Sequence, residues 1–305
     1  MQTRRLLVAI ALIAVAGGSG TVQYPYSPAN YFPTPSDLEV FNVYPLVGRK
    51  IGIPVPFRLG QVVFGPDGKS LYTTAGYDPK NPNWDKPGLL KVEFSPTRVS
   101  TVPGTIDFGI TAVAVSIRQD KILISGIRTA DGQRTCGLFE VRLPKGAIRR
   151  IVETPACDYQ SSWTELSVSP AGEEAVGRYN KGVQLIDLVT GTVTPIGQNF
   201  WQGSLSPDGK WIAAFGNGSQ STLVLLDPND LTHRRNLGKT GGGGYWSPDS
   251  RYLLLFKDQL RCGIGSYFYS METLEVETGK RSVVPSSQCK IEGGASGWVS
   301  SDIAQ

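Results

Sequence analysis

Few residues in this sequence of 305 amino acids have the chemistry of an acid–base or metal site. The only histidine, His233, lies in a polar stretch between Asp230 and Arg235. A general base needs a partner that orients it, and no partner motif accompanies His233, so we interpret it as a solvated histidine. A single histidine and the lack of a Cys/His cluster with ligand spacing also argue against zinc. We therefore expect no metal and no cofactor.

Motifs for other kinds of catalysis are also missing. No Gly-x-Ser-x-Gly motif is followed by Asp and His in the order of an α/β-hydrolase. The four glycines at 241–244 lack the Lys-Ser/Thr of a phosphate-binding loop, and we interpret them as a flexible entry to a strand. The segment 227–230 offers oxygen atoms to calcium, but its spacing favours a plain Asx turn. The sequence predicts no catalytic residue.

The four cysteines are more informative. Cys136 and Cys157 are 21 residues apart, and Cys262 and Cys289 are 27 apart. Each pair brackets a predicted hairpin, and each first member precedes a glycine. Four cysteines allow three pairings, and only one pairing is local in both cases. We predict disulfides Cys136–Cys157 and Cys262–Cys289; the alternative is four buried free thiols.

These residues must be positioned by a repeated element. Copies of a motif with the form strand, Ser-Pro-Asp-Gly-Lys turn, strand occur at 63–73, 204–213 and 245–254, with weaker copies at 113–125 and 166–177 and a trace at 298–302. Proline presets φ for such a turn, and Asp and Gly suit the reversal that follows. The motifs recur every 37 to 53 residues. Strand-rich repeats of about 40 to 50 residues are typical of β-propeller blades.

A second hairpin follows each full copy, which makes a four-stranded blade. The chain ends supply parts of one more blade: a hairpin at 38–53 and a first strand at 298–300. We predict an all-β propeller of six four-stranded antiparallel blades, closed by pairing of the N- and C-terminal strands. The second strand of the shared blade is either Tyr24–Phe32 or absent, which would leave three strands.

The repeat resembles that of TolB-type propellers. The closest copy runs from Val183-Gln184-Leu185-Ile186-Asp187-Leu188-Val189-Thr190-Gly191 to Ser206-Pro207-Asp208-Gly209-Lys210, and the resemblance covers 60–302 at the level of the repeat. It implies the fold. Members of this group include periplasmic scaffolding proteins, sensor-like domains and the propeller domains of prolyl oligopeptidase-type peptidases. About 40 residues precede the first repeat after the predicted leader, so we expect no TolB-like N-terminal α/β domain.

The N-terminus is typical of an export signal. A positive region at 1–5 is followed by the apolar run 6–16, which ends in Ala14-Val15-Ala16. We predict a signal peptide at 1–16, a linker at 17–37 and one propeller domain at 38–305, in a periplasmic or secreted protein. An uncleaved membrane anchor is the alternative; after cleavage we expect no stable membrane insertion.

The net charge of +4 falls to 28 basic against 26 acidic residues without Arg4 and Arg5. The basic residues are scattered, so we expect no nucleic-acid partner. We expect a monomer that binds a protein or peptide, with a small ligand as another possibility.

The candidate binding site lies four and five residues before the repeat serines, where inner strands begin next to the predicted central channel. The predicted binding residues are Trp163, Thr164, Glu165, Trp201, Gln202, Tyr245 and Trp298. The alternative is that these side chains serve blade packing and rim solvation.

The function predicted from these features is an exported, non-catalytic binding or scaffolding propeller of the cell envelope. One alternative is a propeller enzyme of the metal-dependent lactonase or lyase type, for which Glu165 and Asp107 are the candidate carboxylates. Another is an accessory propeller related to prolyl oligopeptidase-type peptidases.

Overall fold

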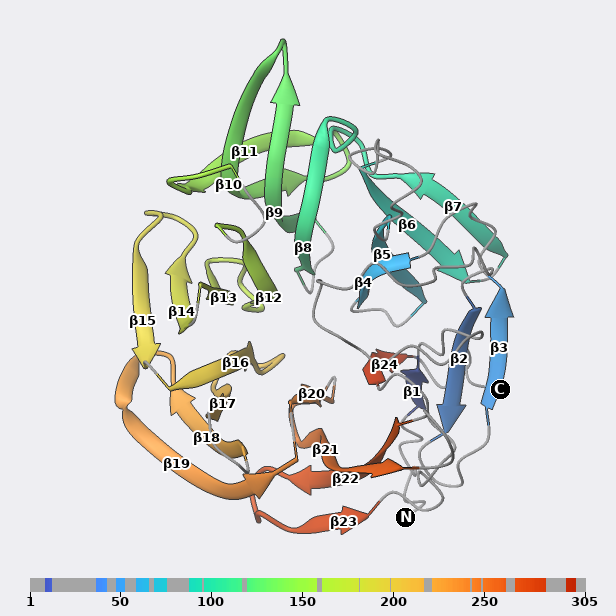
Figure 1. Ribbon diagram of the computed structural model, residues 1–305, viewed down its shortest axis with the longest axis vertical. Helices are drawn as coiled ribbons and strands as arrows, with labels where there is room; N and C mark the ends of the chain where they lie inside the picture. Colours follow the sequence, from blue (N-terminus) through green and yellow to red (C-terminus); the bar gives the residue numbers. More distant parts are fainter. Residues whose placement is uncertain are drawn as a thin grey trace, which may run out of the picture.

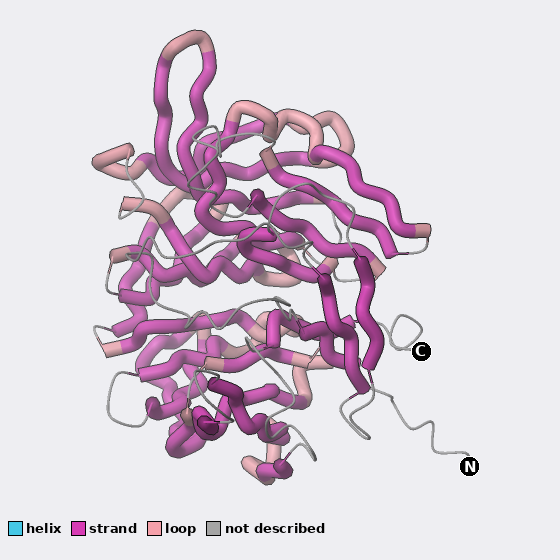
Figure 2. Tube along the Cα trace, turned by 45° about the vertical axis from the view of Figure 1, so that its right-hand side comes forward, coloured by secondary structure: helices cyan, strands magenta, loops and turns pink. Residues whose placement is uncertain are grey.

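The computed structural model describes sixteen segments of the chain. They are residues 9–12, 37–42, 48–52, 59–65, 69–75, 88–94, 96–116, 120–157, 161–180, 182–197, 199–216, 221–241, 243–247, 249–261, 267–283 and 295–299. Their regular secondary structure is all strand, as Figure 2 shows. None of the described residues forms a helix of the length and hydrophobicity that a membrane span requires.

The strands pair into six four-stranded antiparallel sheets. Five of the sheets are blades whose four strands are consecutive in the chain. Their strands are β4 (Leu59–Phe64), β5 (Ser70–Ala75), β6 (Leu89–Phe94) and β7 (Thr97–Thr101); β8 (Phe108–Val115), β9 (Lys121–Ala130), β10 (Gln133–Arg142) and β11 (Ala147–Glu153); β12 (Trp163–Val168), β13 (Glu174–Tyr179), β14 (Gly182–Asp187) and β15 (Val193–Gly197); β16 (Phe200–Leu205), β17 (Ile212–Gly216), β18 (Ser221–Asp227) and β19 (Asp230–Thr240); and β20 (Gly244–Trp246), β21 (Tyr252–Arg261), β22 (Tyr267–Glu275) and β23 (Arg281–Val283).

The blades follow one another around a ring, with the first strand of each blade nearest the centre and the last at the periphery (Figure 1). This arrangement confirms the predicted all-β propeller.

The remaining sheet joins the two ends of the chain. Its order is β24 (Ala295–Val299), β1 (Ala9–Leu12), β2 (Asp37–Asn42) and β3 (Gly48–Gly52). The predicted hairpin at 38–53 and the predicted C-terminal strand are both present. The second strand, however, is β1, which differs from both alternatives drawn from the sequence. In the pairing register, Ile10 of β1 lies opposite Trp298 of β24 on one side and opposite Phe41 of β2 on the other. Residues 24–32 lie outside the described part of the chain.

The repeated turn is held by its own side chains. In the copy at 206–211, the Ser206 hydroxyl donates to Asp208 Oδ1 at 2.7 Å and accepts from the Trp211 amide at 3.0 Å. Gly209 has a φ of +76°, a conformation that favours glycine. The copy at 247–252 repeats both serine bonds, at 2.6 and 2.9 Å. The motif therefore recurs because each inner hairpin needs the same reversal.

The hydrophobic core lies between neighbouring blades. Phe108 and Phe139 meet edge to face at 5.0 Å in the cluster that joins the β4–β7 and β8–β11 blades. Similar clusters follow at the next three junctions, centred on Trp163, Val183 and Phe215. Because each sheet is covered on both faces, its strands are rich in consecutive apolar residues.

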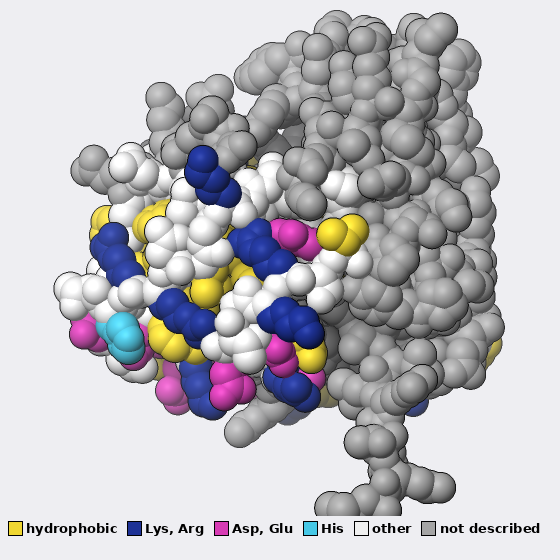
Figure 3. All heavy atoms as spheres, turned by 90° about the horizontal axis from the view of Figure 1, so that it is seen from below, with side chains coloured by type: hydrophobic (Ala, Val, Ile, Leu, Met, Phe, Trp, Pro, Cys, Tyr) yellow, Lys and Arg dark blue, Asp and Glu magenta, His cyan; other side chains and the backbone are white. Residues whose placement is uncertain are grey.

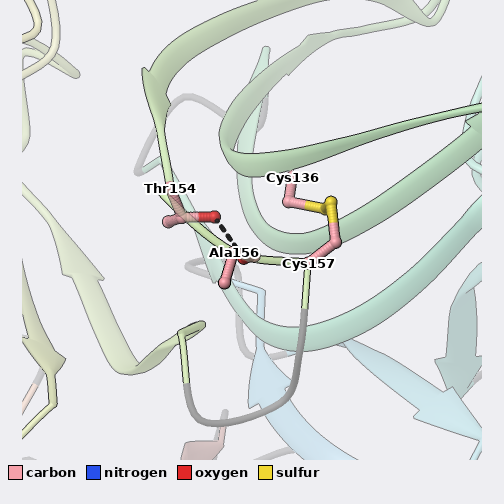
Figure 4. Close-up of a disulfide and its surroundings, with 4 residues drawn as sticks. All are labelled: Cys136, Thr154, Ala156 and Cys157. Carbon is pink, nitrogen blue, oxygen red and sulfur yellow. Dashed lines mark hydrogen bonds between the residues drawn. A yellow bond between two sulfur atoms is a disulfide. The ribbon is translucent and has the colours of Figure 1, made fainter.

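The β9–β10 hairpin extends beyond the rest of the ring (Figures 1 and 2). Near its base Cys136 is bonded to Cys157, with 5.3 Å between the Cα atoms, which confirms one predicted disulfide (Figure 4). The Thr154 amide also donates to the Cys136 carbonyl at 3.2 Å. The chain after β11 is thereby tied to β10. Cys262 and Cys289 lie outside the described residues, so that pairing stays a prediction.

In the coloured part of the face drawn in Figure 3, lysine and arginine side chains lie among aspartate and glutamate side chains. The histidine on this face, His233, belongs to the outer strand β19; its side chain is 61% exposed and its Nδ1 lies 4.0 Å from Asp227. This environment agrees with a solvated histidine.

Candidate binding site at the centre of the ring

Four of the inner strands share an irregularity near their first residues. The pairing register shifts between Leu59 and Val62 in β4, between Ile110 and Ala112 in β8, between Thr164 and Ser167 in β12, and between Phe200 and Gln202 in β16. A β-bulge bends its strand and redirects the side chains beside it. These shifts fall at the positions, four and five residues before the repeat serine, that the sequence predicted as binding positions.

Glu165 has the least ordinary environment among the predicted residues. Its φ is +54°, which is uncommon for a residue with a side chain. Its Oε2 atom is buried and has no hydrogen-bond partner among the described residues. Burial raises the pKa of the Glu165 carboxyl above its ordinary value, and the positive charge of Arg178 opposes that rise. Backbone strain and an unsatisfied buried oxygen cost free energy and need an explanation.

Tyr245 lies on β20, the first strand of the blade two positions along the ring from that of Glu165. Burial raises the pKa of its phenol to about 12, and the negative charge of Glu165 contributes to the rise. The phenol therefore stays protonated at neutral pH. Its ring contacts Phe256 edge to face at 6.3 Å.

Gln202 links the same region to the glycine run. A Cβ atom on Gly243 would lie only 1.6 Å from Gln202 Oε1, so a side chain at position 243 would displace this amide. Gly243 therefore lies directly beside the side-chain amide of Gln202 on β16. We call Glu165, Arg178, Gln202, Gly243 and Tyr245 the central site; they come from three blades.

Several other buried polar atoms elsewhere in the fold lack a partner among the described residues. They are Trp163 Nε1, Gln184 Oε1, Ser204 Oγ and Arg128 Nε. Folded proteins leave few such atoms unpaired, and those that remain often meet water or a ligand. Two of them, with Glu165, belong to the β12–β15 blade.

The remaining predicted residues have structural contacts. Trp163 is 2% exposed and packs on Tyr179 at 5.0 Å, so it is a core residue. Trp201 donates from Nε1 to the Gly216 carbonyl at 3.0 Å. Thr164 is half-buried beside Arg178, to whose carbonyl its hydroxyl donates at 3.5 Å. The backbone of Trp298 lies in β24, and its side chain is outside what the structure describes.

Arg178 was not predicted as a site residue. Its signal in the sequence was a charged residue within the otherwise apolar β13 segment Ala175-Val176-Gly177, which is hard to distinguish from an ordinary strand end. Asp107, the second candidate carboxylate for an enzyme, is exposed. Within the described ranges, no three Asp, Glu, His or Cys side chains gather as a metal-binding group would.

Two comparisons with known proteins gave no match: no protein-family model matches the sequence, and no curated protein resembles it significantly.

Many solved structures share the fold. TolB from Acinetobacter baumannii aligns with a TM-score of 0.63 and 14% identity, over 96% of this chain and 66% of that one, so this chain spans just under two thirds of that protein. A putative TolB from Agrobacterium tumefaciens aligns with a TM-score of 0.56 and 16% identity, over 82% of this chain and 88% of the other. A chain of the nidogen/laminin complex gives 0.51 and 9%, over 82% and 90%. At these identities the likeness establishes the fold, a β-propeller whose solved structural neighbours include TolB proteins.

Proposed function

We propose that this protein is an exported, non-catalytic binding propeller of the cell envelope, and that its partner binds at the central site. Glu165 carries the proposal. A carboxylate oxygen is buried there without a partner, on a residue in left-handed backbone conformation, and both features cost stability. A ligand that donates a hydrogen bond to Oε2 would offset part of this cost.

The surroundings of Glu165 suggest the class of ligand. Gln202 and the protonated phenol of Tyr245 add further hydrogen-bonding groups, and Arg178 adds a positive charge. An extended peptide offers amide donors and carbonyl acceptors in alternation, which suits this mixture. A protein or peptide partner is therefore our first choice over a small ligand.

Ring closure by a sixth blade formed from β24 and the β2–β3 hairpin is part of the proposal; because β1 lies in the predicted signal peptide, the blade of the mature protein would keep three strands, with β24 beside β2. The innermost strand β24 contacts β20 of the last blade and β4 of the first. This position continues the ring of inner strands (Figure 1). Closure would leave unpaired edges only at the outer strands and at the central channel, where they are short or protected.

Export is supported by two observations. The Cys136–Cys157 disulfide fits an oxidising compartment, and the repeat in the sequence resembles that of TolB-type propellers, a group that includes periplasmic scaffolding proteins. The apolar run at 6–16 would act as the signal peptide that directs export.

The test is an affinity pull-down from envelope extract with the mature protein, followed by mass spectrometry of the bound material. Glu165→Gln keeps the side-chain volume and changes the hydrogen-bonding pattern. Glu277→Gln makes the same chemical change at an exposed position in the turn after β22. We expect a partner that the parent and Glu277→Gln retain and Glu165→Gln loses. A partner retained equally by all three proteins would show that the central site is not where it binds.

A further inference from the structure

A second candidate site lies at the other end of strand β12 from Glu165, and it is independent of the proposed function. A cleft of about 260 Å³ opens between the β8–β11 and β12–β15 blades. Its lining includes Lys121, Glu140, Arg142, Arg149, Leu188 and Val189. These residues come from β9, β10, β11 and the turn after β14, so the cleft is a feature of the junction between two blades.

The base of the cleft is a buried carboxylate surrounded by three positive side chains. Glu140 is 3% exposed. Its Oε1 accepts from Arg142 Nε at 2.7 Å, while its Oε2 lies 3.4 Å from Arg149 Nη2 and 4.0 Å from Lys121 Nζ. Burial raises the pKa of Glu140, but the bond from Arg142 and the three positive charges outweigh burial and hold the pKa below its ordinary value.

The last consecutive blade, β20–β23, also has a buried carboxylate held by a positive side chain, and it serves as a comparison for Glu140. Glu272 is also buried on the third strand of its blade, and its described cationic partner is Arg281. The guanidinium of Arg281 also donates to the carbonyls of Leu237, at 2.7 Å, and Lys239, at 2.8 Å. One arginine therefore holds a buried carboxylate and joins two blades at the same time.

Arg149 repeats that role beside Glu140, because it donates to Glu140 and to the Leu188 carbonyl of the next blade at 2.8 Å. By this comparison one arginine is enough to hold the buried carboxylate, so among the described residues Glu140 has two more positive neighbours, Lys121 and Arg142, than Glu272 has. Arg142 is 60% exposed, and its two terminal nitrogens have no partner among the described residues. These nitrogens are available as charged donors for an anion.

The charge around the cleft favours a small anion of single charge. The exposed Glu173 also lines the cleft, and Asp120 lies close enough to Arg142 to affect its pKa. A phosphate dianion would be repelled by Glu140, Glu173 and Asp120, whereas one carboxylate can pair with the planar guanidinium of Arg142. Beside the basic group, the side chain of Val189 is 67% exposed, which provides an apolar contact.

We propose that this cleft binds a peptide or protein segment that carries a carboxylate next to an apolar side chain. The carboxylate pairs with Arg142 and Lys121, and the apolar side chain covers Val189. The carboxylate belongs either to a chain terminus or to an Asp or Glu side chain, and the choice of probes separates these two sources.

The experiment is a titration of the full protein, followed by ¹⁵N–¹H NMR, with three peptides and inorganic phosphate. The peptides are acetyl-Gly-Leu with a free C-terminus, its C-terminal amide, and acetyl-Leu-Asp-amide. We expect saturable shifts around the cleft for the first peptide, the third, or both, and none for the uncharged amide. The first and third peptides report the chain terminus and the acidic side chain, respectively.

Two variants and a matched control complete the test. We expect Arg142→Gln to weaken peptide binding at least tenfold and Lys121→Gln to weaken it less, because the planar guanidinium of Arg142 can bind both oxygens of the peptide carboxylate, whereas Lys121 offers a single ammonium. Arg150→Gln changes a neighbouring exposed arginine that pairs with Glu153 outside the cleft, and it should bind as the parent does. Equal binding of the uncharged amide, tighter binding of phosphate than of any peptide, equal loss in Arg150→Gln, or no saturable shift would each overturn the proposal.

Discussion

Glu165 and Tyr245 act on each other across the centre of the ring, although β12 and β20 belong to blades that are separated by a third blade. The charge of Glu165 helps to raise the pKa of the Tyr245 phenol to about 12, and the Glu165 pKa is itself raised by burial. Two inner strands thus place a carboxyl and a phenol together where neither gains stability from ionising. Such destabilised polar groups are typical of sites kept for binding rather than for folding.

Glu165→Gln is expected to be at least as stable as the parent at pH 7. An acid whose pKa is higher in the folded than in the unfolded state destabilises the fold as pH rises through that window. The parent should therefore lose stability relative to the variant as the pH rises above about 4.3, the ordinary pKa of glutamate. Thermal melts of both proteins at pH 4 and pH 7 measure this difference. Glu153→Gln, which is exposed, should stay within about 0.5 kcal/mol of the parent at both pH values. A melting temperature for Glu165→Gln well below that of the parent at pH 7 would mean that the carboxylate is structural.

Replacing both Cys136 and Cys157 with serine should lower the stability by about 3 kcal/mol, because the crosslink closes a loop of moderate length. For a domain of this size that corresponds to a fall in melting temperature of roughly 6 to 12 °C. Differential scanning calorimetry gives the value, and non-reducing peptide mapping of the parent shows whether the bond is formed. An unchanged melting temperature in the double variant would show that the bond contributes nothing to stability.

Whether strand β1 is present in the mature protein depends on the residue at which that protein begins. The structure pairs Ala9–Leu12 between β24 and β2, yet the same residues lie in the predicted signal peptide. We expect intact-mass analysis of the protein from the envelope to give a chain that begins at Gly17, which would remove β1 from that sheet. A chain that begins at Met1 would contradict cleavage and leave β1 in place.

Deletion of residues 295–305 should destabilise the whole domain, because it removes β24 from between β20 and β4. The deletion would also uncover the parts of β20 and β4 that β24 contacts, and such newly exposed surface promotes aggregation. We expect a fall in melting temperature of at least about 5 °C, which corresponds to a loss of about 1 to 3 kcal/mol for a domain of this size. Deletion of 301–305 alone serves as the control. A melting temperature within a degree or two of the parent would argue against closure by this strand.

The repeat made the fold readable from the sequence. The serine, aspartate and glycine of each inner turn are needed locally, so they recur and mark the blades; Ser206 and Asp208 show this directly. The Cys136–Cys157 pair was predictable for the same reason, because both residues flank one hairpin.

The central site was less accessible. Glu165 and Gln202 were found by counting back four residues from the repeat serine, but the predicted binding residue Trp163, two residues before Glu165, is buried in the core. The bulges decide which side chains turn inward, and no local residue pattern marks a bulge reliably. Arg178, and the cluster around Glu140, depend on contacts between separate strands that periodicity does not reveal. The role of Ala9–Leu12 was hidden because an apolar run suits a signal peptide and a buried strand equally well.

The most direct test of the central claim is hydrogen–deuterium exchange of the protein with and without the partner that Glu165→Gln fails to capture. We predict slower exchange on binding in three segments that are distant in sequence, 163–166, 200–203 and 243–246, with the outer strands unchanged. Protection confined to outer strands such as β19 or β23, with these three segments unaffected, would contradict binding at the central site.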